Sequence, residues 1–246
     1  MRIGFLADLH ANREATEACM KALSRAGCKR FVFLGDLIGY GADPAWVVDF
    51  VRAQVAAGAV AVQGNHDAAL REGAGGALHA EARAAIDWTR ARLDDAQRSF
   101  LLGLPLAVED GDRLYVHANA FDPGGWAYVH NALAVERSLA ATGCSLTLVG
   151  HVHDQALHYT GTAGQPIRFD PVPGVAVPLL ASRRWLAVVG SCGQPRDGNP
   201  AAACAWLDTA GRRLTFLRVP YDHAGAAAKI RAAGLPETFA ARLEGG

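Results

Sequence analysis

Residues 31–44 read FVFLGDLIGYGADP and join a short apolar run to a polar loop and the start of a helix. The run at residues 31–34 has the length and composition of a buried strand, and Pro44 suits the first turn of a helix. Between them stands Asp36, with glycines nearby that leave the backbone free to turn. The stretch therefore predicts a strand with a functional carboxylate just beyond its carboxyl end.

The same alternation continues on both sides of this stretch. Apolar runs at residues 3–7 and 59–62 predict two more strands, and the patterns at residues 15–26 and 44–56 predict helices. Strands that alternate with helices imply right-handed crossovers and a parallel sheet. Because ligands gather beyond the carboxyl ends of such strands, we expect the functional site there.

The rest of the chain is expected to complete one domain, residues 1–246, because no linker interrupts it. Further strands are expected at residues 106–108, 114–116 and 146–149, and helices at residues 78–103 (two helices), 132–141, 221–233 and 236–243. After His153 the chain has short strand-like runs separated by Gly and Pro turns. These runs predict a second, largely antiparallel sheet.

The composition is that of an ordinary globular protein. Of 246 residues, 51% are apolar and 20% charged, and 24 basic side chains balance 24 acidic ones. Without a basic run, a large nucleic-acid partner is disfavoured. No apolar stretch approaches the roughly 20 residues of a membrane-spanning helix, and no leader precedes the first strand, so we expect a cytoplasmic protein without a membrane partner. Five scattered cysteines indicate buried thiols rather than disulfides.

Polar side chains that follow the predicted strands form a set of metal ligands. The set is Asp8, His10, Asp36, Asn65, His117, His151 and His153. Asp8 and His10 stand two residues apart, so both project toward one face of an extended strand end, and His151 and His153 repeat this spacing. Two divalent cations about 3.5–4 Å apart need a shared carboxylate, and Asp36 is placed to supply it.

The order Asp-x-His, Gly-Asp, Gly-Asn-His-Asp, His and Gly-His-x-His resembles the pattern of the calcineurin-like metallophosphoesterase family over nearly the whole chain. The stretches GDLIGYGADP, GNHDAAL and GSCGQPRDGNP are most similar to a bacterial and archaeal branch of small cytosolic enzymes, which includes phosphodiesterases and diadenosine polyphosphate hydrolases. The resemblance implies a four-layer α/β/β/α sandwich, in which two mixed β-sheets are flanked by helices.

The resemblance also implies two divalent metal ions, manganese foremost, with iron, zinc, cobalt or nickel as alternatives. It places Asp8, His10, Asp36 and His153 on one metal, and Asp36, Asn65, His117 and His151 on the other. Ala118 follows His117 where many family members have glycine, which makes His117 the ligand that departs most from the family pattern.

The implied reaction is hydrolysis by attack of a metal-bridging hydroxide on phosphorus. Two divalent ions, balanced by Asp8, Asp36 and the hydroxide, leave the cluster about one charge positive, which suits a phosphoryl group. The resemblance makes His66 the catalytic acid. Its neighbour Asp67 either holds the imidazole and keeps it protonated or caps the helix that follows.

The substrate is expected to be a small phosphorylated molecule, nucleotides included. Asn12 and Arg13 follow the first ligand pair, and Arg196 lies in a Gly-rich turn, so these three are candidates to bind phosphate oxygens. A solvated surface arginine is the ordinary alternative. The sequence is compatible with a homo-oligomer.

Two other functions compete with a small-molecule phosphoesterase. A serine/threonine protein phosphatase would use the same metals but would want an open groove and longer surface loops than this chain provides. A non-catalytic scaffold is expected to have lost ligands, whereas all are present here. Serine acyl transfer and nucleotide-triphosphate loops are excluded, since neither Gly-x-Ser-x-Gly nor Gly-x-x-x-x-Gly-Lys occurs.

Overall fold

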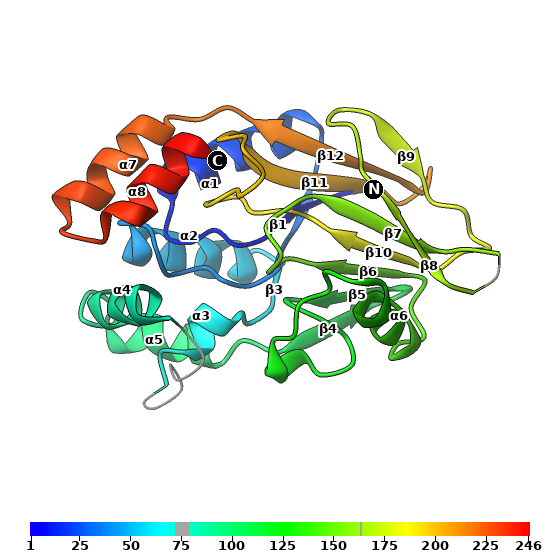
Figure 1. The fold of residues 1–246 in the computed structure, drawn as a ribbon, viewed down its shortest axis with the longest axis horizontal. Coiled ribbons are helices and arrows are strands. Elements are labelled where there is room, and N and C mark those ends of the chain that lie inside the picture. Colours follow the sequence, from blue (N-terminus) through cyan, green and yellow to red (C-terminus); the bar gives the residue numbers. More distant parts are fainter. Residues whose placement is uncertain (72–78, 163) are drawn as a thin grey trace.

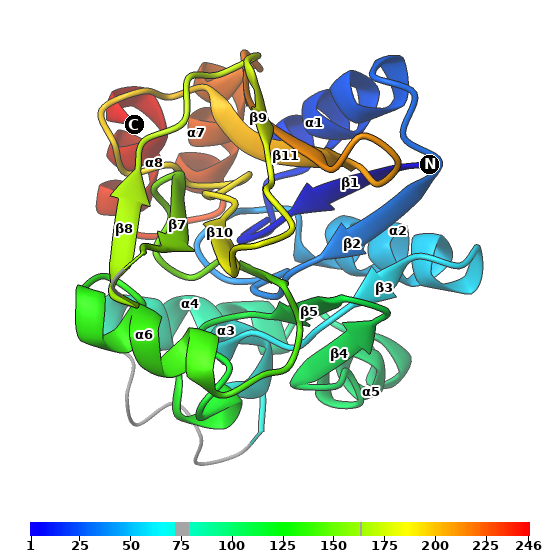
Figure 2. The same cartoon turned by 90° about the vertical axis from the view of Figure 1, so that its right-hand side faces the viewer.

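A computed structural model describes residues 1–71, 79–162 and 164–246, and shows two six-stranded β-sheets packed face to face with helices outside them (Figures 1 and 2). The strands are β1 Arg2–Leu6, β2 Arg30–Phe33, β3 Val60–Ala61, β4 Ala107–Asp110, β5 Arg113–Val116, β6 Leu146–Val149, β7 Ala156–Thr160, β8 Pro166–Phe169, β9 Ala176–Pro178, β10 Trp185–Val188, β11 Ala202–Asp208 and β12 Arg213–Val219. The helices are α1 Arg13–Arg25, α2 Pro44–Ala56, α3 Asn65–Ala68, α4 Ala80–Arg90, α5 Asp95–Leu102, η2 Pro123–Gly125 (a 3₁₀ turn), α6 Ala132–Ala140, α7 His223–Ala232 and α8 Glu237–Gly245.

Both sheets are mixed. The first has the order β3-β2-β1-β11-β12-β9, in which β1, β2 and β3 run parallel and the other three strands pair antiparallel. The second has the order β4-β5-β6-β10-β7-β8, with β5, β6 and β10 parallel. The predicted sandwich of two mixed sheets flanked by helices is therefore confirmed.

The expectation that the strands after His153 form a separate antiparallel sheet is wrong. β11 pairs with β1, and β10 pairs with β6, so strands from the second half of the chain enter both sheets. Without β11, the inner edge of β1 would present a row of unpaired backbone groups. Pairing β1 with β11, a strand from the far end of the sequence, removes that edge. Local sequence patterns do not predict this pairing.

The core between the sheets follows from strand alternation. Ile3 and Phe5 of β1 point toward the second sheet, where they join Tyr115 and Leu148 in one buried cluster. Leu6 points the other way, into a cluster that includes side chains of α1, α2 and α5. On the opposite outer face, α6 packs against β5, β6 and β10. This arrangement gives the four layers seen in Figures 1 and 2.

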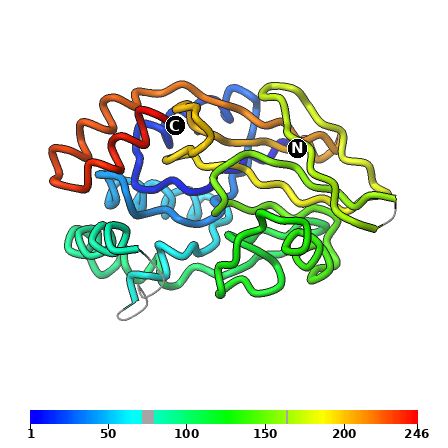
Figure 3. The backbone as a smooth tube through the Cα atoms, in the orientation of Figure 1, coloured from blue at the N-terminus to red at the C-terminus, as the bar shows by residue number. Residues whose placement is uncertain are grey.

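Different parts of the chain form the two ends of the sandwich. Helices α7 and α8 lie at one end, beside α4, and the β8–β9 region lies at the other (Figure 3). The predicted pair of helices in residues 78–103 is present as α4 and α5, although Leu78 itself falls outside the described residues. All five cysteines are free and buried, as predicted. Within the described residues, no helix has the length and apolar character needed to cross a membrane.

The parallel strands of both sheets end on one side of the sandwich. β1 leads to Asp8 and His10, β2 to Asp36, and β5 to His117, each within four residues of the strand. β6 leads to the segment with His151 and His153, and β3 to Asn65, the first residue of α3. The sandwich therefore brings together loops from two sheets and from residues 8 to 153 of the sequence.

Candidate metal centre

Strained backbone is concentrated at the predicted ligands. Positive φ angles occur at Asp8 (53°), His10 (47°), Asp36 (51°), His151 (65°) and His153 (74°). Such angles cost about 1–3 kcal/mol each in a non-glycine residue and persist only where the surroundings enforce them. Here the backbone N–H of Asp8 donates to the carbonyl of Gly35, and that of His10 to the carbonyl of Asp36, both at 3.0 Å. The loops after β1 and β2 therefore hold each other in shape.

Asp8, His10 and His153 form the first cluster. One potential ligand atom from each lies within 4.8 Å of the other two, and all three side chains are buried. The Nε2 atoms of His10 and His153 are 3.3 Å apart, and Nε2 of His153 is 3.5 Å from Oδ1 of Asp8. The backbone N–H of His151 donates to both carboxylate oxygens of Asp8, at 3.1 and 3.0 Å, and fixes the carboxylate.

Asp36, His117 and His151 form the second cluster, which meets the same distance criterion. Oδ2 of Asp36 is 3.5 Å from Nε2 of His117, and Oδ1 of Asn65 is 3.1 Å from the same nitrogen. Oδ2 of Asp36 also lies 3.9 Å from Nε2 of His10, a member of the first cluster. The Asp36 carboxylate thus stands between the two clusters, the place that the sequence predicted for it.

Backbone carbonyls orient the four clustered histidines. In each of them one ring nitrogen donates to a carbonyl oxygen, which leaves the other nitrogen directed at the cluster. The pairs are His10 Nδ1 with Ile38 (3.1 Å), His117 Nδ1 with Leu34 (2.7 Å), His153 Nδ1 with Gln194 (2.6 Å) and His151 Nε2 with Trp126 (2.9 Å). Metal-binding histidines are oriented in this way in known proteins.

The same hydrogen bonds make these residues fit for metal ions. With Nδ1 of His10 and His153 donating to carbonyls, the neutral rings turn two lone pairs toward each other at 3.3 Å. Facing lone pairs repel unless a proton or a cation lies between them. Imidazole nitrogens together with carboxylate and amide oxygens are the donors that borderline divalent cations prefer. The donor set therefore fits metal binding at both clusters.

Burial keeps most of these imidazoles neutral. It lowers the pKa of His151 to about 3, and lowers the pKa values of His10 and His153 well below the ordinary value. The neutral imidazole is the form that binds a metal ion. Three of the four histidines are thus already in the ligand state at neutral pH.

The pKa values of His117 and Asp36 make these two side chains a charged pair. Burial lowers the pKa of His117, but the adjacent Asp36 outweighs it and raises that pKa to about 9. Burial likewise raises the pKa of Asp36, but the surrounding imidazoles, His117 first, hold it well below its usual range. Burial also raises the pKa of Asp8 to about 7, although His117 opposes this. A proton on His117 therefore supplies positive charge that a cation would otherwise provide.

Comparison with known proteins agrees with this geometry. The pattern of the calcineurin-like phosphoesterase superfamily domain matches residues 1–212. The chain belongs to this superfamily. It is therefore a phosphoesterase of a metal-dependent family, and the resemblance noted from its sequence motifs is confirmed.

Individual relatives match this phosphoesterase along almost its full length. A crystal structure of a metallophosphoesterase from Sphaerobacter thermophilus is 33% identical, with a TM-score of 0.87 over 100% of this chain and 99% of that one. An uncharacterized protein of Methanocaldococcus jannaschii is 29% identical over 98% of this chain and 96% of its own. A Pyrococcus horikoshii structure shares the fold at 17% identity, with a TM-score of 0.80 over 98% and 97% of the two chains.

His66 borders both clusters of the phosphoesterase but differs from the other histidines. Its Nε2 is 3.9 Å from Oδ2 of Asp36, and a nitrogen of His66 lies within 4.8 Å of ligand atoms of His10 and Asp36. Its Nδ1 is buried and has no hydrogen-bond partner among the described residues. Burial lowers the pKa of His66, and Asp36 opposes that shift. Within the described residues no carbonyl binds its ring, unlike the rings of the four clustered histidines.

The prediction that Asp67 holds the imidazole of His66 is wrong, because backbone N–H groups bind the Asp67 carboxylate instead. Oδ1 of Asp67 accepts a hydrogen bond from the backbone N–H of Leu37 at 2.9 Å, and Oδ2 accepts one from that of Gly64 at 2.9 Å. Gly64 is the N-cap of α3 and Asp67 is the third residue of that helix, so Asp67 caps the helix that contains it, which agrees with the alternative prediction of a capping role. A carboxylate with such backbone donors at hand is held by the loops rather than by the neighbouring imidazole.

A pocket of about 730 Å³ opens beside the clusters and includes Asn65, His66 and His151 in its lining. Arg196 lies in this lining, where it was expected. Sequence reasoning missed several other side chains of the pocket: Tyr40, Arg71, Trp126, Tyr128 and Arg242. They come from separate loops and from α8, and only Tyr40 belongs to a stretch that carries one of the motifs.

Asn12 and Arg13 are not in the described lining of that pocket. Asn12 is the N-cap of α1, where its Oδ1 accepts from the backbone N–H of Ala15 at 3.1 Å. Its Nδ2 donates to the carbonyl of Gly193 at 2.8 Å. Arg13 is half-exposed and pairs with Glu17 at 2.8 Å. The structure gives both residues structural contacts in place of the substrate contacts that the sequence suggested.

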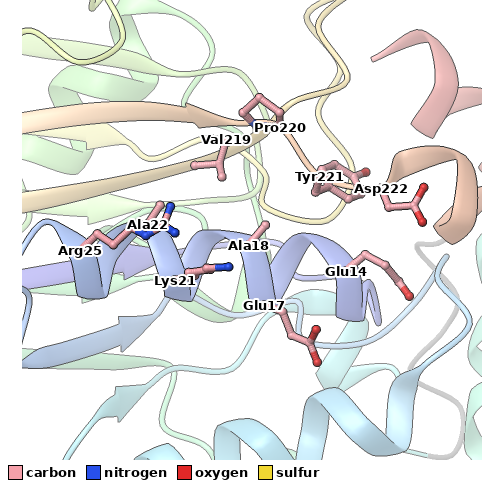
Figure 4. Close-up of a pocket in the computed structure, with 10 residues that line it drawn as sticks. All are labelled: Glu14, Glu17, Ala18, Lys21, Ala22, Arg25, Val219, Pro220, Tyr221 and Asp222. Atoms are coloured by element: carbon pink, nitrogen blue, oxygen red, sulfur yellow. The ribbon is translucent and has the colours of Figure 1, made fainter.

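A second hollow, of about 460 Å³, lies between α1 and residues 219–222 (Figure 4). Charged side chains of both signs surround it, among them Glu14, Glu17, Lys21 and Arg25. None of the predicted ligands is in its described lining. The pocket beside the clusters is therefore the one that can present a phosphate to them.

Proposed function

We propose that this phosphoesterase binds two divalent cations and hydrolyses phosphodiester or phosphoanhydride bonds of small molecules, nucleotides among them. The first cation would be held by Asp8, His10, Asp36 and His153, and the second by Asp36, Asn65, His117 and His151. Manganese, iron, zinc, cobalt and nickel all suit such mixed ligands, and manganese is our first choice. The observation that carries the proposal is the position of Asp36, whose Oδ2 lies 3.9 Å from His10 Nε2 and 3.5 Å from His117 Nε2.

When bound, such cations lower the pKa of water toward about 7 and neutralise charge on a phosphoryl group. Within the chain, the four carbonyl-bound histidines keep the site in one geometry. Asp8 and Asp36 set its negative charge, and the fixed carboxylate of Asp8 needs no rearrangement when a ligand arrives. These features favour a hydrolase over a non-catalytic scaffold that only binds a partner.

His66 is the residue that can give a proton to the leaving group. Hydrolysis adds a hydroxyl group to phosphorus and a proton to the departing oxygen. The imidazole of His66 lines the pocket and borders Asp36, and no carbonyl of the described residues accepts a hydrogen bond from its ring. A ring that can carry a proton on either nitrogen is suited to general acid catalysis.

The pocket supports a small substrate. Its volume of about 730 Å³ falls within the range of about 300–1,000 Å³ that is common for small-molecule sites. Tyr128 stacks on His151 with 4.0 Å between ring centroids and is 47% exposed, so one aromatic face stands beside the second cluster. Such a face suits an aromatic ring of the substrate, for example a nucleobase.

Metal content and turnover together test the proposal. The purified protein, loaded with manganese, is assayed on bis-p-nitrophenyl phosphate, p-nitrophenyl phosphate, ATP and diadenosine tetraphosphate, and its metal is counted by mass spectrometry of the acid digest. We expect close to two ions per chain and hydrolysis of at least one diester or anhydride. Asp36→Asn should lose metal and activity together, whereas Asp170→Asn, on an exposed carboxylate that pairs with Arg168, should lose neither.

Three results would count against this function. Hydrolysis of none of the four substrates with any of the five metals would favour a scaffold. Full metal content in the Asp36→Asn variant would contradict the bridging position of Asp36. Preference for a phosphorylated peptide over all four small substrates would favour a protein phosphatase.

A further inference from the structure

Three arginines from three separate segments line the pocket beside the clusters. Arg71 follows α3, Arg196 lies in the loop after β10, and Arg242 belongs to α8. Across residues 1–71, 79–162 and 164–246, no carboxylate forms an ion pair with any of them, and the described lining contains neither Asp nor Glu. Within the described residues the Arg196 side chain contacts neutral groups: Oε1 of Gln194 at 3.0 Å and the ring of Tyr40, whose centroid is 5.7 Å from the guanidinium carbon.

Guanidinium groups that line one pocket without a carboxylate partner in the described part of the chain are suited to bind an anion. Other arginines of this chain have carboxylate partners, such as Arg231 with Glu237 and Glu244. Guanidinium groups bind phosphate through two parallel hydrogen bonds, and Arg is favoured where planar recognition of phosphate is needed. The pocket therefore has more positive charge than the scissile phosphoryl group alone requires.

Helix α8 is packed so that Arg242 faces this pocket. Phe239 is fully buried, with its ring centroid 4.9 Å from that of Tyr40. Tyr40 in turn lies 4.6 Å from the rings of both His10 and His66. Arg242 comes three residues after Phe239, so both side chains project from one face of the helix. The contact of Phe239 with Tyr40 thus fixes α8 against the loop that borders the clusters.

Arg242 also lies outside the part of the chain that matches the superfamily. That match ends at residue 212, whereas α7 and α8 follow it and lie at one end of the sandwich (Figure 1). The metal ligands all fall within the matched part. The superfamily pattern therefore does not include α8, although the structure from Sphaerobacter thermophilus covers the whole chain.

We infer that Arg242, with Arg71 and Arg196, forms a second anion subsite that selects substrates with a further phosphoryl group next to the scissile one. This inference rests on the proposed function, because it assigns the first phosphoryl group to the metal clusters. The substrates it favours are phosphoanhydrides, in which the leaving group is itself a phosphate, over simple diesters with a neutral leaving group. Arg242 is a specificity-determining residue in this scheme.

Binding of two phosphonates tests the subsite without hydrolysis. Methylenediphosphonate carries two phosphoryl groups joined by a carbon that the enzyme cannot cleave, and methylphosphonate carries one. The manganese-loaded protein is titrated with each by calorimetry, and the ratio of the two dissociation constants is compared between variants. Both ligands reach the same cations in every variant, so a change in the ratio reports the arginine.

We expect the wild-type protein to prefer methylenediphosphonate, and Arg242→Gln to lower that preference by about tenfold or more, as loss of a charge-assisted hydrogen bond does. Arg71→Gln should act in the same direction, and Arg242→Lys should restore part of the preference. Arg25→Gln removes the same charge in the other hollow (Figure 4) and should leave the ratio unchanged. Thermal unfolding of each variant verifies that it is folded.

An unchanged ratio in both Arg242→Gln and Arg71→Gln would overturn the subsite, as would a wild-type protein that binds the two phosphonates equally. The substrate panel separates this outcome from failure of the proposed function. If the protein hydrolyses a diester but the ratio of the dissociation constants is the same in wild type and in the arginine variants, the proposed function is supported and the subsite is contradicted. If nothing is hydrolysed but the ratio depends on Arg242, the subsite stands and the function falls.

Discussion

The histidines of the site have two proposed roles, metal ligand and general acid. The hydrogen bond of one ring nitrogen to a backbone carbonyl distinguishes the proposed ligands from the proposed acid. His10, His117, His151 and His153 each donate one ring N–H to a backbone carbonyl. His66 has no such bond, and its Nδ1 lacks any partner among the described residues. A ligand must be held still, whereas an acid must be free to exchange its proton. The hydrogen bonds thus support the separation of roles that the motifs suggested.

Replacement of His66 by Asn should separate turnover from metal binding. Loss of a general acid lowers turnover by about 10²–10⁴-fold, while the two clusters keep all their donors. Turnover is measured on the best substrate of the panel, and metal by mass spectrometry. His153→Asn is the comparison, since it should lose metal as well. A His66→Asn variant that lost its metal would show that His66 is a ligand.

Position 39 requires glycine because His66 lies too close for a side chain there. It has φ of +90°, and a Cβ there would lie 2.4 Å from Nδ1 of His66. Gly39→Ala should therefore displace the imidazole and lower turnover by tenfold or more, in addition to about 1–2 kcal/mol of backbone strain. Gly58→Ala, at φ of +100° with no atom within 4 Å, adds the strain alone. If the two variants lose equal stability and keep equal turnover, Gly39 is not needed to position the imidazole of His66.

At the scale of elements, the sequence predicted what is local and missed what is not. The run 31–34 and the polar residues after it were placed correctly, because a buried strand and its terminal loop are written in consecutive residues. The pairing of β1 with β11 joins residues about 200 positions apart and leaves no local pattern. Asn12 failed as a substrate contact for a related reason, since any Asn before a helix is also an N-cap.

The pocket shows the same limit. Arg196 could be suggested because it stands in a Gly-rich turn near a motif, whereas Arg242 looks like any exposed residue of an amphipathic helix. Only the packing of Phe239 on Tyr40 brings α8 to the site. Residues that reach a site through tertiary packing cannot be found from the pattern of their own helix.

The loops after β2 and β3 depend on one buried carboxylate. Asp67 accepts hydrogen bonds from the backbone N–H groups of Leu37 (2.9 Å) and Gly64 (2.9 Å), with Ile38 at 3.4 Å. Asp67→Ala leaves these buried donors unpaired, and we expect it to lower the free energy of unfolding by about 2–4 kcal/mol, measured by chemical denaturation. Asp67→Asn, which keeps one acceptor oxygen, should lose less.

The matched control for this prediction is Asp122→Ala, because Asp122 is an exposed carboxylate that lies after β5 in the chain and not in the loops after β2 and β3. It should change the free energy of unfolding by much less than Asp67→Ala. A full loss of turnover in Asp67→Asn, with stability and metal content preserved, would instead restore the catalytic role first considered for Asp67.

At the scale of the whole molecule, net charge is balanced, and the charge that matters is gathered at the site. The described lining of the large pocket contains three arginines and no carboxylate, while Asp8 and Asp36 are buried among the histidines. A neutral protein can thus attract a polyanion to one place without the basic surface that a nucleic-acid partner would need. Local concentration of charge, rather than total charge, is what suits this chain to small phosphates.

The same buried charges make metal uptake depend on pH. In the metal-free protein the pKa of His117 is raised to about 9 and that of Asp8 to about 7, so both groups bind protons at or below neutral pH. His117 therefore contributes stability below its ordinary pKa near 6.5, and this is lost as pH rises through about 9. A cation must displace the same proton, so its apparent affinity should increase with pH.

Between pH 7 and 9 we expect the apparent manganese affinity to rise by about tenfold per pH unit, with release of close to one proton, and more steeply below pH 7, where Asp8 is also protonated. Calorimetric titration in buffers of different ionisation enthalpy measures the protons released. The affinity should level off above pH 9, because His117 is then neutral without the metal. An affinity that is constant from pH 7 to 9 would mean that His117 carries no proton in the metal-free protein, and the charged pair with Asp36 would then not exist.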